Sequence, residues 1–135
     1  MGKITVQAII NADVKKVWDS YTNPEHITKW NFASDDWHCP GADNDMRVGG
    51  TYNARMEAKD GSFGFDFEAI YDEVKENETF TYSFGGRSVT VTFDDLGGKT
   101  QVTVTFDAER EHPEEFQKEG WQAILNNFKK YTEGK

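Results

Sequence analysis

Three short segments constrain the fold of this chain most, because each lies midway between runs in which apolar and polar residues alternate. The segments are Asp60-Gly61, Gly85-Gly86 and Gly97-Gly98. Two-residue loops of this composition are strong signals for tight β-hairpins. If all three are hairpin loops, each one fixes which residues lie opposite each other on the strands that it joins.

Hairpins centred on these loops place apolar residues opposite apolar residues. The predicted pairs are Met56–Phe65, Ala54–Phe67 and Tyr52–Ala69, then Tyr82–Val89 and Phe80–Val91, then Phe93–Val102, Val91–Val104 and Val89–Phe106. The same register puts polar residues such as Arg55 and Asp66 opposite each other on the second face. A shift by one residue would mix the two faces. We therefore predict a five-strand antiparallel meander between residues 50 and 106, with one apolar face.

The segments before the meander predict a strand and two short helices. Residues 4–10 alternate between apolar and polar, as a half-buried strand does. Asp13 offers a helix start before apolar residues at helical spacing up to Tyr21. Asn23 and Pro24 repeat that start signal, because proline suits a first helical turn. Ile27 and Trp30 give the second helix its apolar side.

The end of the chain predicts one long helix. Pro113 is a natural first-turn residue, and two glutamates follow it. An apolar stripe at helical spacing comprises Phe116, Trp121, Ile124, Leu125, Phe128 and Tyr131. This stripe needs a large apolar surface, which the one-faced sheet offers. The predicted fold class is α+β: a strand, two short helices, an antiparallel meander, and a long C-terminal helix packed across a curved sheet.

Composition narrows the class of protein. A chain of 135 residues predicts a single domain over residues 1–135. The formal net charge is −9 and the basic residues form no run, so we expect no nucleic-acid partner. One cysteine cannot form an internal disulfide, and no apolar run reaches membrane-spanning length. We therefore expect a cytoplasmic protein without membrane insertion, and the sequence gives no reason to expect a cofactor.

The order of elements resembles the helix-grip fold of START-type lipid-binding domains and birch-pollen-allergen-like proteins. Within that superfamily, the sequence is similar to the branch named after the C-terminal domain of the activator of the heat-shock protein 90 ATPase. The similarity lies in "VWDSYTNPEHITKW" at 17–30, "SDDWHCPGADNDMRVGGTY" at 34–52, "GSFGFDFEAIYDEV" at 61–74 and "GWQAILNNFKKY" at 120–131. The resemblance implies a cavity between the sheet and the last helix, but it does not imply one activity.

The expected cavity predicts a ligand-binding set with no charged member. It comprises Tyr52, Met56, Phe65, Phe67, Tyr82, Trp121, Leu125 and Phe128, with Trp30 and Trp37 near the mouth. Aromatic walls with a few polar handles suit a small lipophilic or aromatic molecule. The same residues could instead simply fill the core. A binding or carrier protein is the favoured function.

Two other functions stay open. An enzyme resembling the cyclases or hydrolases that act on polyketide-like molecules needs a titratable group beside its substrate. Arg55, Asp66 and Glu68 would supply one only if the two faces of the sheet were reversed, and Glu57 shares this ambiguity. The resemblance also allows a co-chaperone with a chaperone partner, although no residue pattern marks a docking surface.

The segment "SDDWHCPGADND", residues 34–45, contains His38 and Cys39 side by side. Zinc needs three or four converging ligands, which this segment does not offer, so we predict no metal site. Pro40 favours extended backbone, in which neighbouring side chains point in opposite directions. A nucleophilic Cys39 would need a histidine from elsewhere in the chain, His26 or His112. We expect instead a loop at the cavity mouth, with Trp37 packed as a plug and the aspartates facing water.

Overall fold

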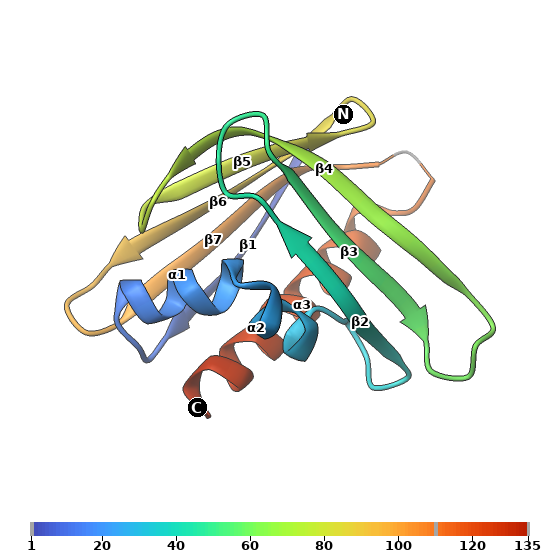
Figure 1. Cartoon of the computed structure of the whole chain (residues 1–135), viewed down its shortest axis with the longest axis horizontal. Helices are drawn as coiled ribbons and strands as arrows, with labels where there is room; N and C mark the ends of the chain where they lie inside the picture. Colours follow the sequence, from blue (N-terminus) through green and yellow to red (C-terminus); the bar gives the residue numbers. More distant parts are fainter. Residues whose placement is uncertain (1, 110, 135) are drawn as a thin grey trace.

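The computed structural model describes residues 2–109 and 111–134. Within them, the elements follow the chain as β1 (Lys3–Ile10), α1 (Val14–Thr22), α2 (Pro24–Trp30), β2 (Trp37–Asn44), β3 (Thr51–Ala58), β4 (Gly64–Lys75), β5 (Thr79–Phe84), β6 (Arg87–Asp95), β7 (Thr100–Asp107) and α3 (Glu114–Glu133). The strands form one antiparallel sheet in the order β1-β7-β6-β5-β4-β3-β2 (Figure 1).

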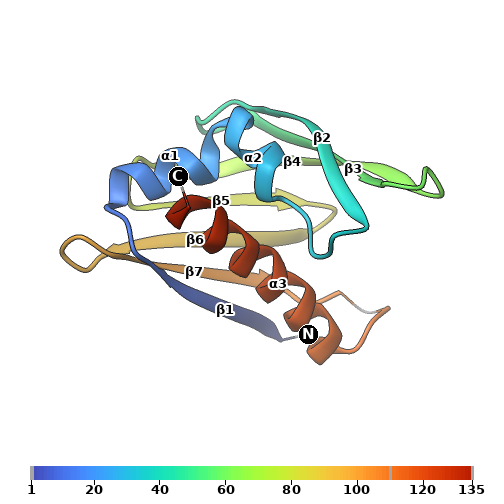
Figure 2. The ribbon, with the colours of Figure 1, turned by 90° about the horizontal axis from the view of Figure 1, so that it is seen from below.

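The sheet curls around the helices. The long helix α3 runs diagonally across its concave side, over β1, β7 and β6, while α1 and α2 lie beside the C-terminal half of α3 (Figure 2). No helix in the described part of the chain combines the length and apolarity that crossing a bilayer requires. The α+β helix-grip architecture predicted from the sequence is confirmed.

The predicted strand register is confirmed at every pair. Met56 lies opposite Phe65, Tyr82 opposite Val89 and Phe93 opposite Val102. Gly85-Gly86 and Gly97-Gly98 form their loops with positive φ at both residues, which glycine adopts without strain.

The first hairpin loop is longer than the predicted two residues. It spans residues 59–62, because the Asp60 carboxylate accepts a hydrogen bond from the Ser62 backbone N–H at 2.8 Å. Such an Asx-turn diverts the backbone from the strand ladder. The pairing beyond the loop is unchanged, because Ala58 N–H still donates to the Phe63 carbonyl at 2.9 Å.

The two short helices begin where the sequence predicts. The Asp13 carboxylate accepts from Lys16 N–H, and the Asn23 side chain accepts from Glu25 N–H ahead of Pro24. These bonds satisfy backbone donors that a helix start leaves free. The two capping bonds therefore define where each helix begins.

Two details of the last helix were predicted wrongly. Pro113 is the residue before α3 rather than part of its first turn. Phe116 is not part of the buried stripe: it is 61% exposed and stacks on His112. Gln117 is buried in its place, because its side chain accepts from Glu109 N–H at 2.8 Å and donates to the His112 carbonyl at 2.7 Å.

The segment 34–45, predicted as a loop, contains strand β2. Within the described residues this strand pairs with β3 alone, so it is an edge strand, and its register shifts between His38 and Gly41. Proline is tolerated at sheet edges and bulges because it lacks a ladder donor, which explains how Pro40 fits. The four aspartates of this segment are exposed, as expected.

Candidate ligand-binding cavity

A cavity of about 220 Å³ lies between the inner face of the sheet and the helices. Its lining residues are Tyr21, Trp30, Asn31, Asn44, Tyr52, Met56, Phe65, Phe67, Tyr71, Phe80, Tyr82, Val104, Trp121, Ile124 and Leu125. Phe65 lines the cavity and is also 43% exposed, so the cavity reaches the surface beside that residue. Most of the lining side chains are aromatic or aliphatic.

Eight of the predicted ligand-binding residues line this cavity. They are Trp30, Tyr52, Met56, Phe65, Phe67, Tyr82, Trp121 and Leu125. Phe128 does not line it: its fully buried ring packs edge-on against Tyr21 and Trp30. Trp37 also lies outside the lining and contacts Phe63 and Phe65 at the end of the β3–β4 hairpin. Ligand binding by the eight stays a prediction.

The sequence prediction omitted four lining residues with polar side chains. Tyr21 was assigned to the apolar side of the first short helix but not to the cavity. Tyr71 continues the alternation Phe65, Phe67, Ala69 by two residues, so extending that period would have found it. Asn44 lies in the segment that was assigned to a loop, and its position became clear only with β2. Asn31 follows the end of α2 and carries no pattern that marks it.

Asn44 holds one side of the cavity together through two short hydrogen bonds. Its Oδ1 accepts from the Tyr71 hydroxyl at 2.6 Å, and its Nδ2 donates to the Thr22 carbonyl at 2.7 Å. The bonds connect β4, β2 and α1. Because buried polar groups are costly when unpaired, this bridge fixes the Tyr71 ring in the cavity wall.

Asn31 is bonded much more weakly. Its Nδ2 lies 3.3 Å from the Tyr52 hydroxyl, 3.6 Å from Met56 Sδ and 4.0 Å from Cys39 Sγ. Sulfur is a weak acceptor, and the contact with oxygen is long for a hydrogen bond. The amide of Asn31 therefore remains available to a stronger acceptor in the cavity.

The cavity wall is electrically neutral. Among the described residues, the lining includes no Asp, Glu, Lys, Arg or His. Burial raises the pKa of Tyr21, Tyr52, Tyr71 and Tyr82 well above the ordinary tyrosine value. These hydroxyls therefore keep their protons at neutral pH and are able to donate hydrogen bonds.

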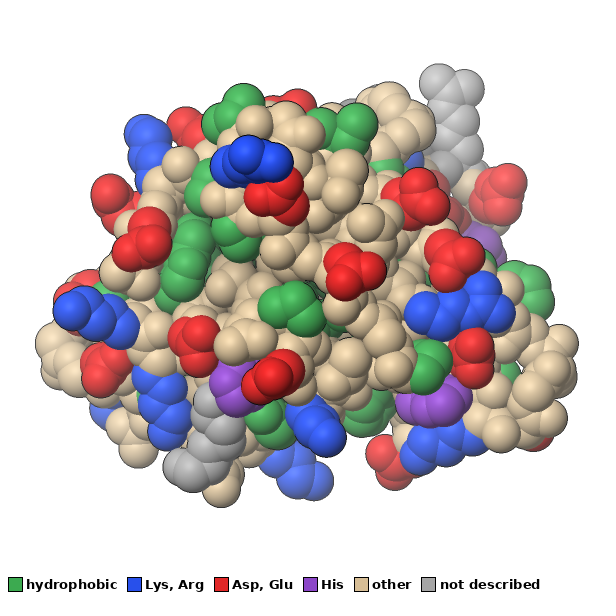
Figure 3. Space-filling model, viewed as in Figure 1, with side chains coloured by type: hydrophobic (Ala, Val, Ile, Leu, Met, Phe, Trp, Pro, Cys, Tyr) green, Lys and Arg blue, Asp and Glu red, His purple; other side chains and the backbone are tan. Residues whose placement is uncertain are grey.

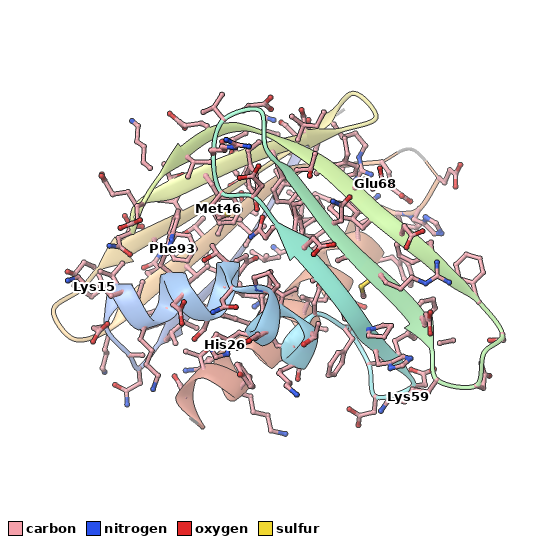
Figure 4. All side chains as sticks on the ribbon, viewed as in Figure 1. Lys15, His26, Met46, Lys59, Glu68 and Phe93 are labelled. Atoms are coloured by element: carbon pink, nitrogen blue, oxygen red, sulfur yellow. The ribbon has the colours of Figure 1, made fainter. Side chains whose placement is uncertain are left out.

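The acidic residues considered for catalysis lie on the other face of the sheet. Arg55 Nε contacts Glu57 Oε2 at 2.9 Å and its Nη1 contacts Asp66 Oδ1 at 3.5 Å. The Asp66 side chain is 67% exposed, and Glu68 is exposed on the side of β4 away from the helices (Figure 4). The reversed arrangement, in which these residues would face the cavity, is wrong, because the Ala54, Ala69 and Tyr52 side chains occupy the inner face.

His38 and Cys39 point to different environments, as predicted. Cys39 is 2% exposed and burial raises the pKa of its thiol, whereas the half-exposed His38 contacts Glu57 Oε1 at 3.6 Å. His26 contacts Tyr131 and Asp19 instead, and His112 contacts Glu109. In the described residues, no three His, Cys, Asp or Glu side chains converge as a metal site would need.

A curled antiparallel sheet that holds a long C-terminal helix over an apolar cavity defines the helix-grip class of ligand-binding folds. Within that class, the chain belongs to the family described as activator of Hsp90 ATPase homolog 1-like protein, whose model matches residues 11–133. None of the curated proteins matches the chain.

Solved structures of similar proteins agree with this assignment. An AHSA1-like protein from Aeromonas hydrophila is 42% identical, with a TM-score of 0.92 over 98% of this chain and 93% of that one. A protein from Cytophaga hutchinsonii is 48% identical, with a TM-score of 0.85 over 98% and 92% of the two chains. A protein from Chromobacterium violaceum, 23% identical with a TM-score of 0.86 over 98% and 99%, shares the fold.

Proposed function

We propose that this protein binds a small, neutral, lipophilic or aromatic molecule in the cavity and acts as a carrier or receptor for it. The observation that carries the proposal is a predominantly aromatic and aliphatic lining without a charged side chain among the described residues. An ionised ligand would lose its hydration there without gaining a counter-charge, which costs several kcal/mol or more. Neutral ligands avoid that penalty.

The volume of the cavity supports a ligand with a single ring or with two fused rings. An engineered apolar cavity of about 150 Å³ binds benzene, and drug-sized molecules occupy pockets of about 300 Å³ or more. The cavity here, at about 220 Å³, lies between those sizes. A longer molecule would have to extend past Phe65 into solvent.

Binding fits the lining better than acid–base catalysis does. A general acid or base works best with a pKa near the operating pH, whereas burial raises the pKa of every lining tyrosine and of the nearby Cys39 thiol. Asp66 and Glu68 lie across the sheet. An enzyme would have to use a different set of groups. Turnover of a polyketide-like substrate that is abolished by Asp66→Asn or Glu68→Gln would contradict this reasoning.

Titration with tetralin, a neutral molecule of two fused rings, tests the proposal. Trp30 and Trp121 line the cavity while Trp18 and Trp37 do not, so the chain contains its own controls. We expect NMR shifts of the first pair of indole signals and little change in the second pair. Naphthoate, a charged molecule of similar size, should bind more weakly.

A matched pair of variants separates cavity binding from surface adsorption. Ile124→Phe fills the cavity from α3, whereas Ala123→Phe adds the same ring at a neighbouring position outside the lining. Tetralin should lose affinity for the first variant only. Equal affinity for both variants, or a response spread evenly over all four tryptophans, would exclude the cavity as the site.

We also propose a chaperone partner as a second candidate. The family is named after an activator of an ATPase, and Trp37, Phe63 and Phe65 form an aromatic cluster in which the two phenylalanines are exposed. Exposed apolar clusters often bind partners. Stimulation of heat-shock protein 90 ATPase activity by this protein, lost in Phe63→Ser, would support the partner; no stimulation would remove it.

The remaining expectations concern the setting of this activity. On the face shown in Figure 3, acidic and basic side chains are interspersed and the basic ones form no patch, which supports a protein without a nucleic-acid partner. A cytoplasmic location remains our proposal, and it accords with a single unpaired cysteine. Fractionation of cells that express the tagged protein tests the location.

A further inference from the structure

The hydroxyl groups of four tyrosines form one polar patch inside the apolar cavity. Tyr21, Tyr52, Tyr71 and Tyr82 come from α1, β3, β4 and β5, and all four line the cavity. They are close enough that ionisation of one would raise the pKa of others: Tyr21, Tyr52 and Tyr71 all act on Tyr82 in this way. The rest of the wall is mostly hydrocarbon, apart from the amides of Asn31 and Asn44, the Met56 sulfur and two tryptophan indoles, so a bound molecule would meet most of its polar contacts at this patch.

Three of the four hydroxyl groups in the patch donate no hydrogen bond to a described residue. The Tyr71 hydroxyl donates to Asn44, and the Tyr52 hydroxyl accepts from Asn31. Tyr82 is 7% exposed, yet among the described residues neither its hydroxyl nor that of Tyr21 makes a hydrogen bond. Among the described residues, Thr132 Oγ1 is the fully buried side-chain oxygen without a partner, so the Tyr21 and Tyr82 hydroxyls reach the open space of the cavity that they line. The patch thus presents unused O–H donors to a bound molecule.

We infer that the ligand of this cavity carries a carbonyl oxygen, which accepts hydrogen bonds from Tyr82 and Tyr21 and from the weakly bonded amide of Asn31. This inference rests on the proposed function and narrows it to neutral ketones, quinones or similar carbonyl compounds with one or two rings. A carboxylate also offers acceptors, but it brings a charge that the lining does not compensate.

Two molecules that differ in one carbonyl group test the inference. Tetralin and α-tetralone have the same fused-ring body, and only the second has a carbonyl oxygen. A hydrogen bond is worth about 0.5–1.5 kcal/mol, so wild-type protein should bind α-tetralone roughly two- to twelvefold more tightly than tetralin. The comparison needs no variant and is therefore independent of any effect of mutation on folding.

Variants then identify the donors. Tyr82→Phe keeps the ring and removes the hydroxyl, so it should reduce the ratio of the affinity for α-tetralone to the affinity for tetralin; Tyr21→Phe provides a second test. Tyr131→Phe is the matched control, because the Tyr131 hydroxyl contacts His26 at 2.7 Å outside the cavity lining. It should keep the full preference.

The possible results separate the two proposals. Equal affinity of wild-type protein for both molecules would overturn the carbonyl inference and leave the binding function intact. Failure of both molecules to bind would overturn the function and the inference together. A preference that survives in the Tyr21→Phe/Tyr82→Phe double variant would show that the carbonyl contacts other groups, and would also overturn the inference.

Discussion

Replacement of Gly120 by alanine should stabilise this protein. Gly120 lies inside α3, and a Cβ atom added there would meet no heavy atom within 4 Å. Glycine in a helix interior is about 0.8–1 kcal/mol less favourable than alanine, because it loses more backbone freedom on folding. Since the new methyl group has open space, nothing in the structure opposes this gain.

The gain can be measured by urea denaturation. With a denaturant dependence of about 2 kcal/mol per M, Gly120→Ala should raise the urea midpoint by roughly 0.4–0.5 M. It should raise the thermal midpoint by roughly 3–5 °C. Both values assume a two-state transition, which coincident fluorescence and circular dichroism curves would establish.

Gly98→Ala is the matched control. A Cβ at Gly98 also meets no atom within 4 Å, but its φ is +92°. Because a side chain in the left-handed region costs about 1–2 kcal/mol, this variant should lower the midpoint. The two substitutions are alike in chemistry and in available space and differ in backbone conformation. If Gly120→Ala lowered stability as well, the reasoning from helix propensity would be refuted, and α3 would need a glycine at this position.

Three further predictions concern single side chains. Phe128→Ala removes a fully buried ring that contacts Tyr21 and should cost about 3–5 kcal/mol in urea denaturation; a loss below about 1 kcal/mol would contradict its place in the core. Lys3 and the Ser88 N–H lower the pKa of Asp107, so that carboxylate stabilises the fold at neutral pH and loses its effect as the pH falls through its folded-state pKa. Asp107→Asn should therefore be destabilising at pH 7, with the difference from wild type shrinking below about pH 4, and a constant difference would refute the assignment. The buried Cys39 thiol, whose pKa is raised, should react slowly with a disulfide reagent at pH 7 in the folded protein and rapidly in urea; equal rates would contradict its burial.

The sequence specified the sheet well because hairpin loops and alternation act locally. The Gly85-Gly86 loop places Tyr82 opposite Val89, and the other inward-facing pairs of β5 and β6 follow from it at every second residue. Strand β2 was predicted as a loop although Pro40 favours extended backbone, because the local sequence does not show that the segment pairs at the edge of the sheet, where a proline is tolerated. That knowledge comes from the assembled fold.

The sequence predicted those cavity residues that lie on the apolar face of a strand or helix. Tyr52, Phe67 and Trp121 were found because their side chains repeat at the period of their element. Asn31 was not found, because its place in the wall results from the end of α2 meeting β3, which no local pattern encodes. Polar residues that complete a cavity are thus the ones that sequence periodicity predicts least well.

Periodicity also cannot distinguish a cavity wall from a filled core. In the structure the two are distinguished by comparing the size of the inner side chains with how deeply they are buried. The inner faces of β6 and β7 carry valines such as Val91 and Val102, and these small side chains are completely buried. The inner faces of β3 and β4 carry the larger Met56 and Phe67, yet these are only half-buried. If the helices packed equally over the whole sheet, Met56 and Phe67 would be buried at least as well as the valines of β6 and β7. Because α3 packs chiefly on β1 (Figure 2), it leaves the β3–β4 half incompletely filled, and the uncovered aromatic surface of that half becomes the wall of the cavity.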